Sequence, residues 1–363
     1  MLKVKTLVVI GIVVFGAIIP ISIFKGLNSN DSVPTSNVKN DESTWEYHYS
    51  LEAAGWSSEK LMKARTYFDS LNSTAAIAIV DGKVLFEWGD VSKNTNVHSI
   101  RKSFLSALFG IHHENGIDLH ATLKELDIKE IQPLSDLEKE AQVVDLLTSR
   151  SGVFLKSGQE SWNMRRKRPI RGRFAPGSFF YYNNWDFNVL GTIFNKQTGT
   201  DLFEEFFKKL ALPLGMEDFS LEQTKYKYEF KKSLHPSYLF QMSARDMARF
   251  GQLYLQNGNW KGQQIIPENW VIESTAIQAH VPGNNVYDYG YMWWVAEPSQ
   301  FEGGKLISAV GRYGQSIDII PSLNLVFVHR LDSNQKSWLS LPQKVSQEER
   351  LQLLKLVIDA KAP

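Results

Sequence analysis

Strand-like runs stand near both ends of this 363-residue chain, and a long helix-rich stretch separates them. On the N-terminal side, Ala75–Val80 and Val84–Trp88 flank Asp81-Gly82, a dipeptide typical of β-hairpin turns. Further runs rich in β-branched and aromatic residues come much later, at 289–295, 305–310, 316–320 and 325–330. Because strands must pair to be stable, this distribution predicts one antiparallel sheet assembled from both ends of the chain.

Apolar residues at helical spacing predict helices around this sheet. They occur near the start of the domain at 57–71, through the middle at 143–147, 185–198, 202–210 and 244–256, and at the end at 347–360. The expected fold is therefore α+β, with helices flanking the sheet and a large, mainly helical inserted lobe formed by the middle of the chain.

The composition suits a folded domain with a sizeable core. Hydrophobic residues make up 43% of the chain, and the formal net charge is only +1, which argues against a nucleic-acid binder. The sequence contains no cysteine, which excludes a thiol nucleophile, a disulfide framework and a cysteine-linked lipid anchor.

The first residues are of a different kind. Lys3 and Lys5 precede an uncharged run from Leu7 to Phe24, which as a helix of about 27 Å just spans the hydrocarbon core of a membrane. We expect residues 1–27 to be a membrane anchor or signal sequence, residues 28–44 a polar linker, and residues 45–363 the folded domain. The bulky stretch Pro20–Phe24 at the end of this run offers no small-residue cleavage site, which favours an uncleaved anchor.

The lysines before the apolar run predict the orientation of this anchor. The positive-inside tendency leaves Met1 in the cytoplasm and places residues 45–363 on the other side of a bacterial cytoplasmic membrane, in the periplasm. If the segment were cleaved, the domain would be secreted.

One serine–lysine pair is the strongest candidate for chemistry. Ser99-Ile-Arg-Lys102 opens an apolar, helix-like run from Ser103 to Ile111. Residues three apart share a helix face, so the Ser99 hydroxyl and the Lys102 amine can come within hydrogen-bond reach. Burial of this run would favour the neutral amine, which could then act as a base toward the hydroxyl. Other serines also precede a lysine by three residues, but none of them opens a strongly apolar helix.

Two downstream motifs extend this pattern. Tyr182-Asn183-Asn184 stands just before a predicted helix, and Ala309-Val310-Gly311-Arg312-Tyr313-Gly314-Gln315 is followed by a strand, a turn and a strand. The order and separation of the three motifs resemble those of the serine β-lactamase and penicillin-binding-protein superfamily, in particular its class C, esterase-like and nylon-oligomer-hydrolase-like branch. The resemblance covers about residues 45–361.

This resemblance implies roles for the matching residues. Ser99 would form a covalent acyl-enzyme, with Lys102 and Tyr182 as proton-transfer groups and Asn184 fixing the lysine and the substrate. The N–H groups of Ser99 and Arg312 would bind the oxyanion, with Gly311 and Gln315 beside them. The sequence departs from the family at Ala309, where relatives carry a Lys or His that helps to hold a substrate carboxylate.

The favoured function is hydrolysis of a small ester or amide, without metal or other cofactor. The alternatives are a D,D-peptidase or β-lactamase acting on cell-wall peptides or β-lactams, and a catalytically silent binding domain. Adjacent His112 and His113 point about 100° apart on a helix and do not form a metal pair. The basic run Arg165–Arg168, with Arg171 and Arg173, is interpreted as a solvated loop, with guidance of an anionic substrate or contact with a phospholipid surface as the alternative.

Overall fold

The structure is a computed structural model that describes residues 44–334 and 343–362. The expected anchor at 1–27, and all of the expected linker except residue 44, lie outside the described residues. Among the helices of the described part, none has the length and apolar character needed to cross a bilayer.

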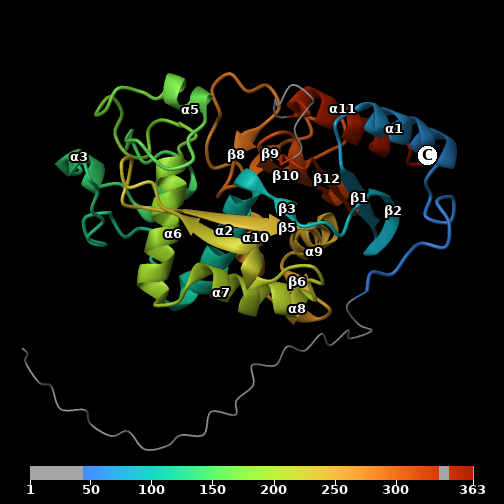
Figure 1. Ribbon diagram of the computed structural model, residues 1–363, viewed down its shortest axis with the longest axis horizontal. Helices are drawn as coiled ribbons and strands as arrows, with labels where there is room; N and C mark the ends of the chain where they lie inside the picture. Colours follow the sequence, from blue (N-terminus) through green and yellow to red (C-terminus); the bar gives the residue numbers. More distant parts are fainter. Residues whose placement is uncertain (1–43, 335–342, 363) are drawn as a thin grey trace, which may run out of the picture. The chain divides into compact units, whose positions relative to one another are not determined.

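Strands lie toward both ends of the described chain, and a helix-rich stretch separates them (Figure 1). The helices are α1 (Ser58–Ser70), α2 (Arg101–His112), α3 (Asp136–Lys139), α4 (Val143–Leu147), α5 (Trp162–Lys167), α6 (Asn184–Thr198), α7 (Leu202–Phe206), α8 (Leu212–Leu214), α9 (Ala244–Leu255), α10 (Glu268–Ser274) and α11 (Gln347–Ile358). The strands are β1 (Ala75–Val80), β2 (Lys83–Gly89), β3 (Thr95–Asn96), β4 (Thr224–Lys227), β5 (Ser237–Met242), β6 (Asn259–Trp260), β7 (Gln263–Gln264), β8 (Asp288–Tyr289), β9 (Trp294–Ala296), β10 (Leu306–Gly311), β11 (Gln315–Ile320) and β12 (Leu325–Arg330).

The main sheet confirms the prediction of a sheet built from both chain ends. Within the described residues it has seven strands in the order β2-β1-β12-β11-β10-β9-β8, and every neighbouring pair is antiparallel. The N-terminal hairpin β1–β2 joins the C-terminal strands through β1 and β12, whose register pairs Ala75 with Arg330. The helical insert lies to one side of this sheet, as expected for this fold class (Figure 1).

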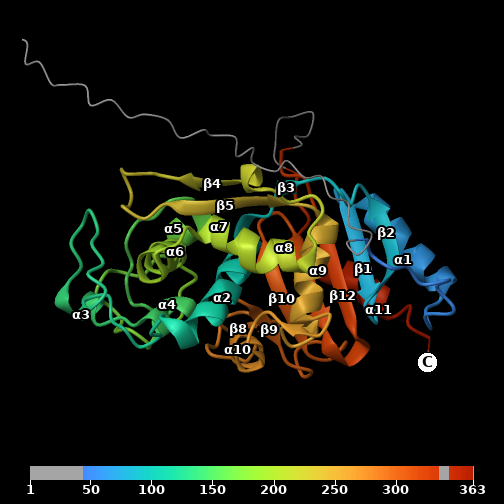
Figure 2. The same cartoon turned by 90° about the horizontal axis from the view of Figure 1, so that it is seen from below.

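Helices cover both faces of the sheet (Figure 2). Alternate side chains of β1 enter two different hydrophobic clusters: Ile77 and Ile79 join the large cluster with α2 and α9, while Ala76 and Ala78 join the cluster with α1 and α11. This period of two is the geometry of a strand. The β1 strand is buried along its whole length because helices pack on both sides of it.

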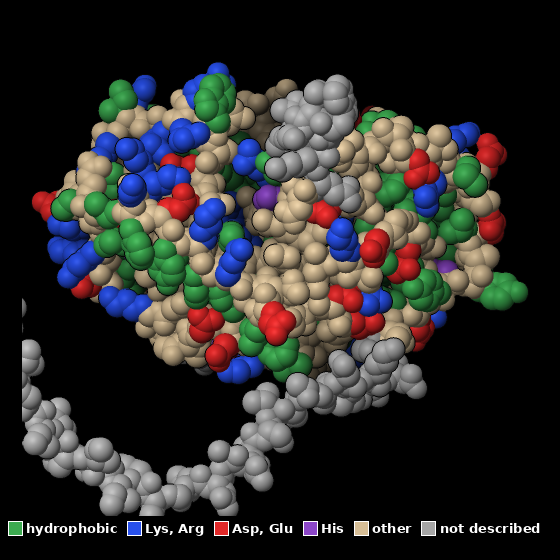
Figure 3. Space-filling view, viewed as in Figure 1, with side chains coloured by type: hydrophobic (Ala, Val, Ile, Leu, Met, Phe, Trp, Pro, Cys, Tyr) green, Lys and Arg blue, Asp and Glu red, His purple; other side chains and the backbone are tan. Residues whose placement is uncertain are grey.

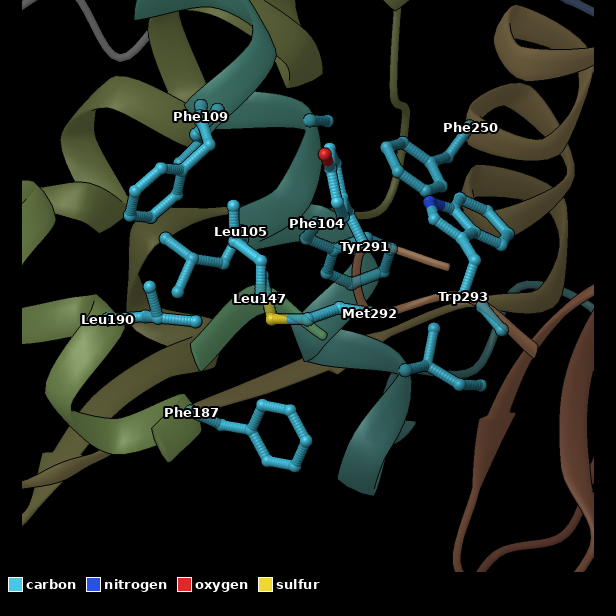
Figure 4. Packing of buried hydrophobic residues seen from close by; sticks show 14 of the residues in the cluster. Phe104, Leu105, Phe109, Leu147, Phe187, Leu190, Phe250, Tyr291, Met292 and Trp293 are labelled. Carbon is cyan, nitrogen blue, oxygen red and sulfur yellow. The ribbon is translucent and has the colours of Figure 1, made fainter. Parts of the chain in front are cut away.

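Helix α2 runs through the centre of the larger cluster. Its residues from Arg101 to Gly110 are all buried, and Phe104 packs edge-on against Phe250 of α9 at 4.8 Å between ring centroids (Figure 4). A Cβ on Gly110 would lie 2.3 Å from the Trp270 ring, so α2 and α10 can pack this closely only because residue 110 is a glycine. Side chains near the N-terminus of α2 are therefore withdrawn from water.

One expectation about secondary structure is wrong. The run 289–295 is not one strand, because β8 ends at Tyr289 and β9 begins at Trp294. Between them the chain turns, with Met292 at φ +61°, and the Met292 carbonyl accepts a hydrogen bond from Ser103 of α2 at 2.9 Å. The side chains of the turn, Tyr291, Met292 and Trp293, fill the core around α2 (Figure 4).

The mainly helical insert is confirmed, and the structure adds a small second sheet that the sequence pattern did not predict. Among the described residues it has three strands in the order β3-β5-β4. Its β3 strand is only two residues long and pairs with β5 across about 145 residues of sequence. Such distant pairing leaves no local signal, yet it fixes the segment that leads into Ser99.

Candidate active site

Ser99 lies at the entrance to α2. It is the central residue of the short 3-10 helix His98–Ile100, which runs directly into α2. The buried side chain of Ile100 anchors this turn in the core, while the side chain of Ser99 stays partly exposed. At the first turn of a helix the backbone N–H groups have no intrahelical acceptor, so they are available to a bound group.

Lys102 contacts both other candidate catalytic groups. Its Nζ donates to Ser99 Oγ at 2.9 Å and to Tyr182 Oη at 2.7 Å. The Tyr182 and Phe187 rings each place their centroids 4.5 Å from the same nitrogen. The structure thus brings the three candidate residues Ser99, Lys102 and Tyr182 into one hydrogen-bonded chain.

The surroundings of Lys102 disfavour its charged form. Only 2% of the residue is exposed, and burial, with a smaller contribution from the adjacent Arg101 charge, lowers the pKa of the Lys102 amine well below its usual value of 10.5. No carboxylate forms an ion pair with Lys102 within the described residues. Its amine is therefore suited to accept a proton.

Contacts of the aromatic ring and hydrogen bonds to the neighbouring backbone hold Tyr182 in place. Its ring stacks on Trp294 at 5.4 Å and contacts Phe187 at 5.0 Å. Ser149 fixes the backbone on both sides of it: Ser149 Oγ donates to the Tyr181 carbonyl at 2.8 Å and accepts the Asn183 N–H at 3.1 Å. Neither Ser149 nor Trp294 was predicted as a partner of Tyr182, because these contacts join separate segments.

Burial keeps this phenol protonated. It raises the pKa of Tyr182 to about 12, against smaller lowering effects from a hydrogen bond with Ser99 and from the Arg101 charge. A protonated phenol next to a lysine of lowered pKa can pass a proton on without carrying a charge itself.

The β10–β11 hairpin forms the wall beside Ser99. Gly311 ends β10 and pairs with Gln315, and a Cβ on Gly311 would lie 2.6 Å from the Val97 carbonyl and 3.4 Å from the Ile100 side chain. Glycine is therefore required for the hairpin to pack this closely against residues 97–100, the segment that contains Ser99. Arg312 follows in the exposed turn, with its guanidinium 4.7 Å from the Tyr313 ring centroid.

Gln315 and Asn184 both bond to backbone carbonyls of the protein. Gln315 is fully buried, and its Nε2 donates to the Asn96 carbonyl at 2.9 Å, which ties the hairpin to β3. Asn184 Nδ2 donates to the Gln159 carbonyl at 2.8 Å and not to Lys102, whose hydrogen bonds go to Ser99 and Tyr182. The expected hold of Asn184 on the lysine is thus not made in the structure, because α6 begins at Asn184 and turns this side chain toward the loop at 158–159.

The family's basic position is part of the core in this chain. Ala309 is 1% exposed and pairs with Ile317 across β10 and β11. Its methyl group belongs to the large hydrophobic cluster, so this position offers no charge to a substrate carboxylate.

His98 precedes Ser99 and has a left-handed backbone at φ +51°. Its Nε2 lies 2.9 Å from Ser333 Oγ, and its ring packs against Tyr313 at 5.3 Å. Burial and the nearby charge of Arg330 lower the pKa of His98 to about 4, so the imidazole is neutral at ordinary pH. The His98 ring packs the β10–β11 turn against the segment that contains Ser99.

The adjacent histidines have separate partners. His112 Nε2 lies 2.8 Å from Glu205 Oε1, and His113 packs on the Trp270 ring at 5.0 Å. Among the described residues, no group of three His, Asp or Glu side chains is placed to hold a metal ion.

Solved structures with the same fold have low sequence identity to this chain. A protein designated a 6-aminohexanoate-dimer hydrolase, from Bacillus anthracis, matches with a TM-score of 0.60 and 23% identity over 81% of this chain and 80% of its own. The octameric penicillin-binding protein homologue from Pyrococcus abyssi matches with a TM-score of 0.61 and 20% identity, over 84% of this chain and 78% of its own. A class C β-lactamase matches with a TM-score of 0.59 and 14% identity, over 88% of this chain and 99% of its own.

These similarities establish the fold, and no curated protein matches the sequence. The β-lactamase family model matches residues 61–337, which is more than half of the chain and includes all three motifs. The chain therefore belongs to the β-lactamase family.

Proposed function

We propose that this protein is a serine hydrolase that cleaves a small ester or amide through an acyl-enzyme on Ser99. The observation that carries the proposal is the position of the Lys102 amine, which is buried and lies within hydrogen-bond distance of both Ser99 and Tyr182. A silent binding domain has no chemical need for a desolvated lysine between two hydroxyl groups. The cost of burying an amine supports a catalytic role.

The mechanism follows from the hydrogen-bonded chain. Ser99 Oγ attacks the substrate carbonyl carbon, and its proton passes to neutral Lys102 Nζ. Tyr182 Oη, which accepts a hydrogen bond from Lys102, passes a proton to the leaving group and receives one from the lysine. A water molecule then attacks the acyl group by the reverse proton path, which releases the acid and restores Ser99.

The negative oxygen of the tetrahedral intermediate requires hydrogen-bond donors. The Ser99 N–H at the helix entrance and the Arg312 N–H beyond Gly311 are the two proposed donors. The close approach of Gly311 to Val97 and Ile100 supports this pairing, because it brings the hairpin next to the nucleophile segment.

The alanine at position 309 favours the esterase or amidase branch. A D,D-peptidase or β-lactamase acts on substrates with a carboxylate, and in this chain the buried Ala309 supplies no cation for that group. We therefore place cell-wall peptides and β-lactams second as substrates.

Intact-mass spectrometry tests the proposal. The full chain is exposed separately to a fluorophosphonate, a p-nitrophenyl ester and a penicillin, alongside Ser99→Ala and the exposed control Ser70→Ala. We expect a mass gain from the fluorophosphonate and the ester that Ser99→Ala abolishes and Ser70→Ala keeps. A stable adduct with penicillin alone would favour the second branch, and no adduct on a folded chain would favour a binding domain.

We also propose that residues 1–27 anchor the domain to a bacterial cytoplasmic membrane, with residues 45–363 in the periplasm. The support is the sequence alone: Lys3 and Lys5 before an uncharged run from Leu7 to Phe24. Protease treatment of intact spheroplasts should digest the domain. If the domain is protected until the cells are lysed, its orientation is the opposite of the one proposed.

A further inference from the structure

Helix α5 and the loop after it expose large apolar side chains next to cations. Trp162 is 61% exposed and Ile170 is 75% exposed, unlike the buried tryptophans at 56, 185, 270 and 293. The Arg166 guanidinium lies 4.7 Å from the Trp162 ring centroid, a cation–π contact on the surface. Because Trp162 and Ile170 lie in one short segment together with several cations, this segment is a candidate contact surface.

The cations of this segment fall into two groups. Arg168 pairs with Glu160, and Arg171 pairs with Glu138 and also donates to the Pro133 carbonyl at 2.6 Å. By contrast, a second group forms no ion pair with any described residue and is exposed; it consists of Arg165, Arg166, Lys167 and Arg173. The paired arginines fix the segment, and the other four cations are available to an external anion.

We call the exposed set the basic-aromatic patch; it comprises Trp162, Arg165, Arg166, Lys167, Ile170 and Arg173. Figure 3 shows Lys and Arg side chains gathered on the face where α5 lies, with few acidic side chains among them. The capping serine Ser161, whose side chain accepts the Met164 N–H at 3.1 Å, holds α5 in place. The patch therefore lies on a capped helix and on a loop that the ion pairs of Arg168 and Arg171 hold to the rest of the domain.

The patch is connected directly to the candidate active site. Tyr181, the neighbour of Tyr182, donates its hydroxyl to the Met164 carbonyl in α5 at 2.7 Å. On the other side of Tyr182, Asn184 donates to the Gln159 carbonyl just before α5. A partner bound to the patch would thus lie beside the segment that holds the proposed proton-transfer phenol.

We propose that the basic-aromatic patch docks on the headgroup region of a bilayer that contains anionic phospholipids. Four unpaired cations match the phosphate charge, and Trp162 and Ile170 match the boundary between headgroups and acyl chains, where aromatic side chains are favoured. A soluble acidic polymer would satisfy the cations and leave both apolar side chains in water. This docking is independent of the reaction proposed for Ser99.

A fluorescent label at position 170 tests the docking in the full chain. Because the sequence has no cysteine, Ile170→Cys gives one site for an environment-sensitive fluorophore, and Ile272→Cys, on α10 and 58% exposed before substitution, is the control site. Each protein is mixed with vesicles of phosphatidylcholine alone or of phosphatidylcholine with phosphatidylglycerol. The emission of the label is the readout, so an N-terminal anchor that holds the protein on both vesicles does not affect the result.

We expect a blue shift at position 170 only with phosphatidylglycerol, reversed by high salt, and none at position 272. Changing Arg165, Arg166 and Lys167 together to Gln should lower the docked-to-undocked ratio by about 10²-fold, since each cation near an anionic surface contributes roughly fivefold. The matched change of Lys60, Lys63 and Lys355 to Gln, which removes the same charge from α1 and α11, should leave the ratio unchanged.

Three results would overturn the proposal. The first is that the label at position 170 keeps its emission in water when anionic vesicles are added. The second is an equal blue shift on neutral vesicles. The third is an equal fall of the docked-to-undocked ratio in both triple variants. A shift produced by polyphosphate in place of vesicles would point instead to a soluble polyanion.

Discussion

The carbonyl oxygen of Val97 faces the Cα of Gly311 so closely that a Cβ on Gly311 would lie 2.6 Å from it. Val97 is buried and lies two residues before Ser99, and Gly311 directly precedes Arg312. The distance between the two proposed oxyanion donors therefore depends on a contact that only glycine permits.

Gly311→Ala should separate the hairpin from the segment that contains Ser99. We expect the rate of Ser99 acylation to fall by about 10²-fold or more, which is typical for the loss of one oxyanion donor. Gly262→Ala is the control, because a Cβ there meets nothing within 4 Å although its φ is +86°. Acylation timed by intact mass, with thermal unfolding recorded for both variants, checks this; an unchanged rate in folded Gly311→Ala would contradict it.

Tyr182→Phe should remove the proton path and keep the packing. The ring contacts with Trp294 and Phe187 survive, while the oxygen that accepts the Lys102 hydrogen bond at 2.7 Å is lost. We expect kcat/KM to fall by about 10²–10⁴-fold, the usual contribution of a general acid or base. Tyr181→Phe is the control, since its hydroxyl bonds to α5 and not to Lys102. Equal losses in the two variants would argue against a catalytic role for the Tyr182 phenol.

The pH dependence of kcat/KM should follow the protonation of Lys102. Burial lowers the pKa of this amine below 10.5, so activity should rise with pH through that lowered pKa, as the lysine becomes neutral. Tyr182, with a pKa of about 12, stays protonated over the same range. A rate profile with a soluble ester measures this. A profile that falls as pH rises through the neutral range would show that the charged lysine is the active form.

Lys102→Met should abolish turnover and stabilise the fold. Because the pKa of Lys102 is lower in the folded protein than in the unfolded chain, the unfolded state binds more protons between the two values, and wild-type stability rises with pH there. The advantage of the variant should be largest below the folded pKa and shrink by at most about 1.4 kcal/mol per pH unit as pH rises toward 10.5. Denaturant unfolding at several pH values, with exposed Lys124→Met as control, measures it; a variant less stable than wild type at low pH would refute the argument.

The parts of the site that sequence could predict are local. Ser99 and Lys102 share a helix face, so their contact follows from a spacing of three residues. The hairpin β1–β2 likewise follows from Asp81-Gly82 between two strand-like runs. Both features need only the geometry of one element.

The parts that sequence did not predict depend on distant segments. The run 289–295 looked like a strand because periodicity does not distinguish a short apolar strand from an apolar turn that packs around α2. Asn184 was expected at Lys102 by resemblance, but its side chain bonds to Gln159 in a neighbouring loop. The stacking of Trp294 on Tyr182 joins residues more than a hundred positions apart.

Ser149 is such a distant partner, and we predict that it positions Tyr182. It is buried, has a φ of +57°, and its hydroxyl bonds to the backbone on both sides of Tyr182. Ser149→Ala removes both bonds, and a phenol displaced by about 1 Å from Lys102 should cost up to about 10²-fold in kcat. Because Ser149 does not touch the reacting atoms, KM should change little.

Ser149→Gly separates positioning from strain. It also lacks the hydroxyl, but glycine adopts a positive φ without cost. If the hydroxyl positions Tyr182, both variants should lose kcat to a similar extent, and combining either with Tyr182→Phe should add little, since the phenol that Ser149 holds is already gone. If Ser149→Gly keeps wild-type kcat while Ser149→Ala loses it, backbone strain at position 149 is the cause and the positioning role is wrong.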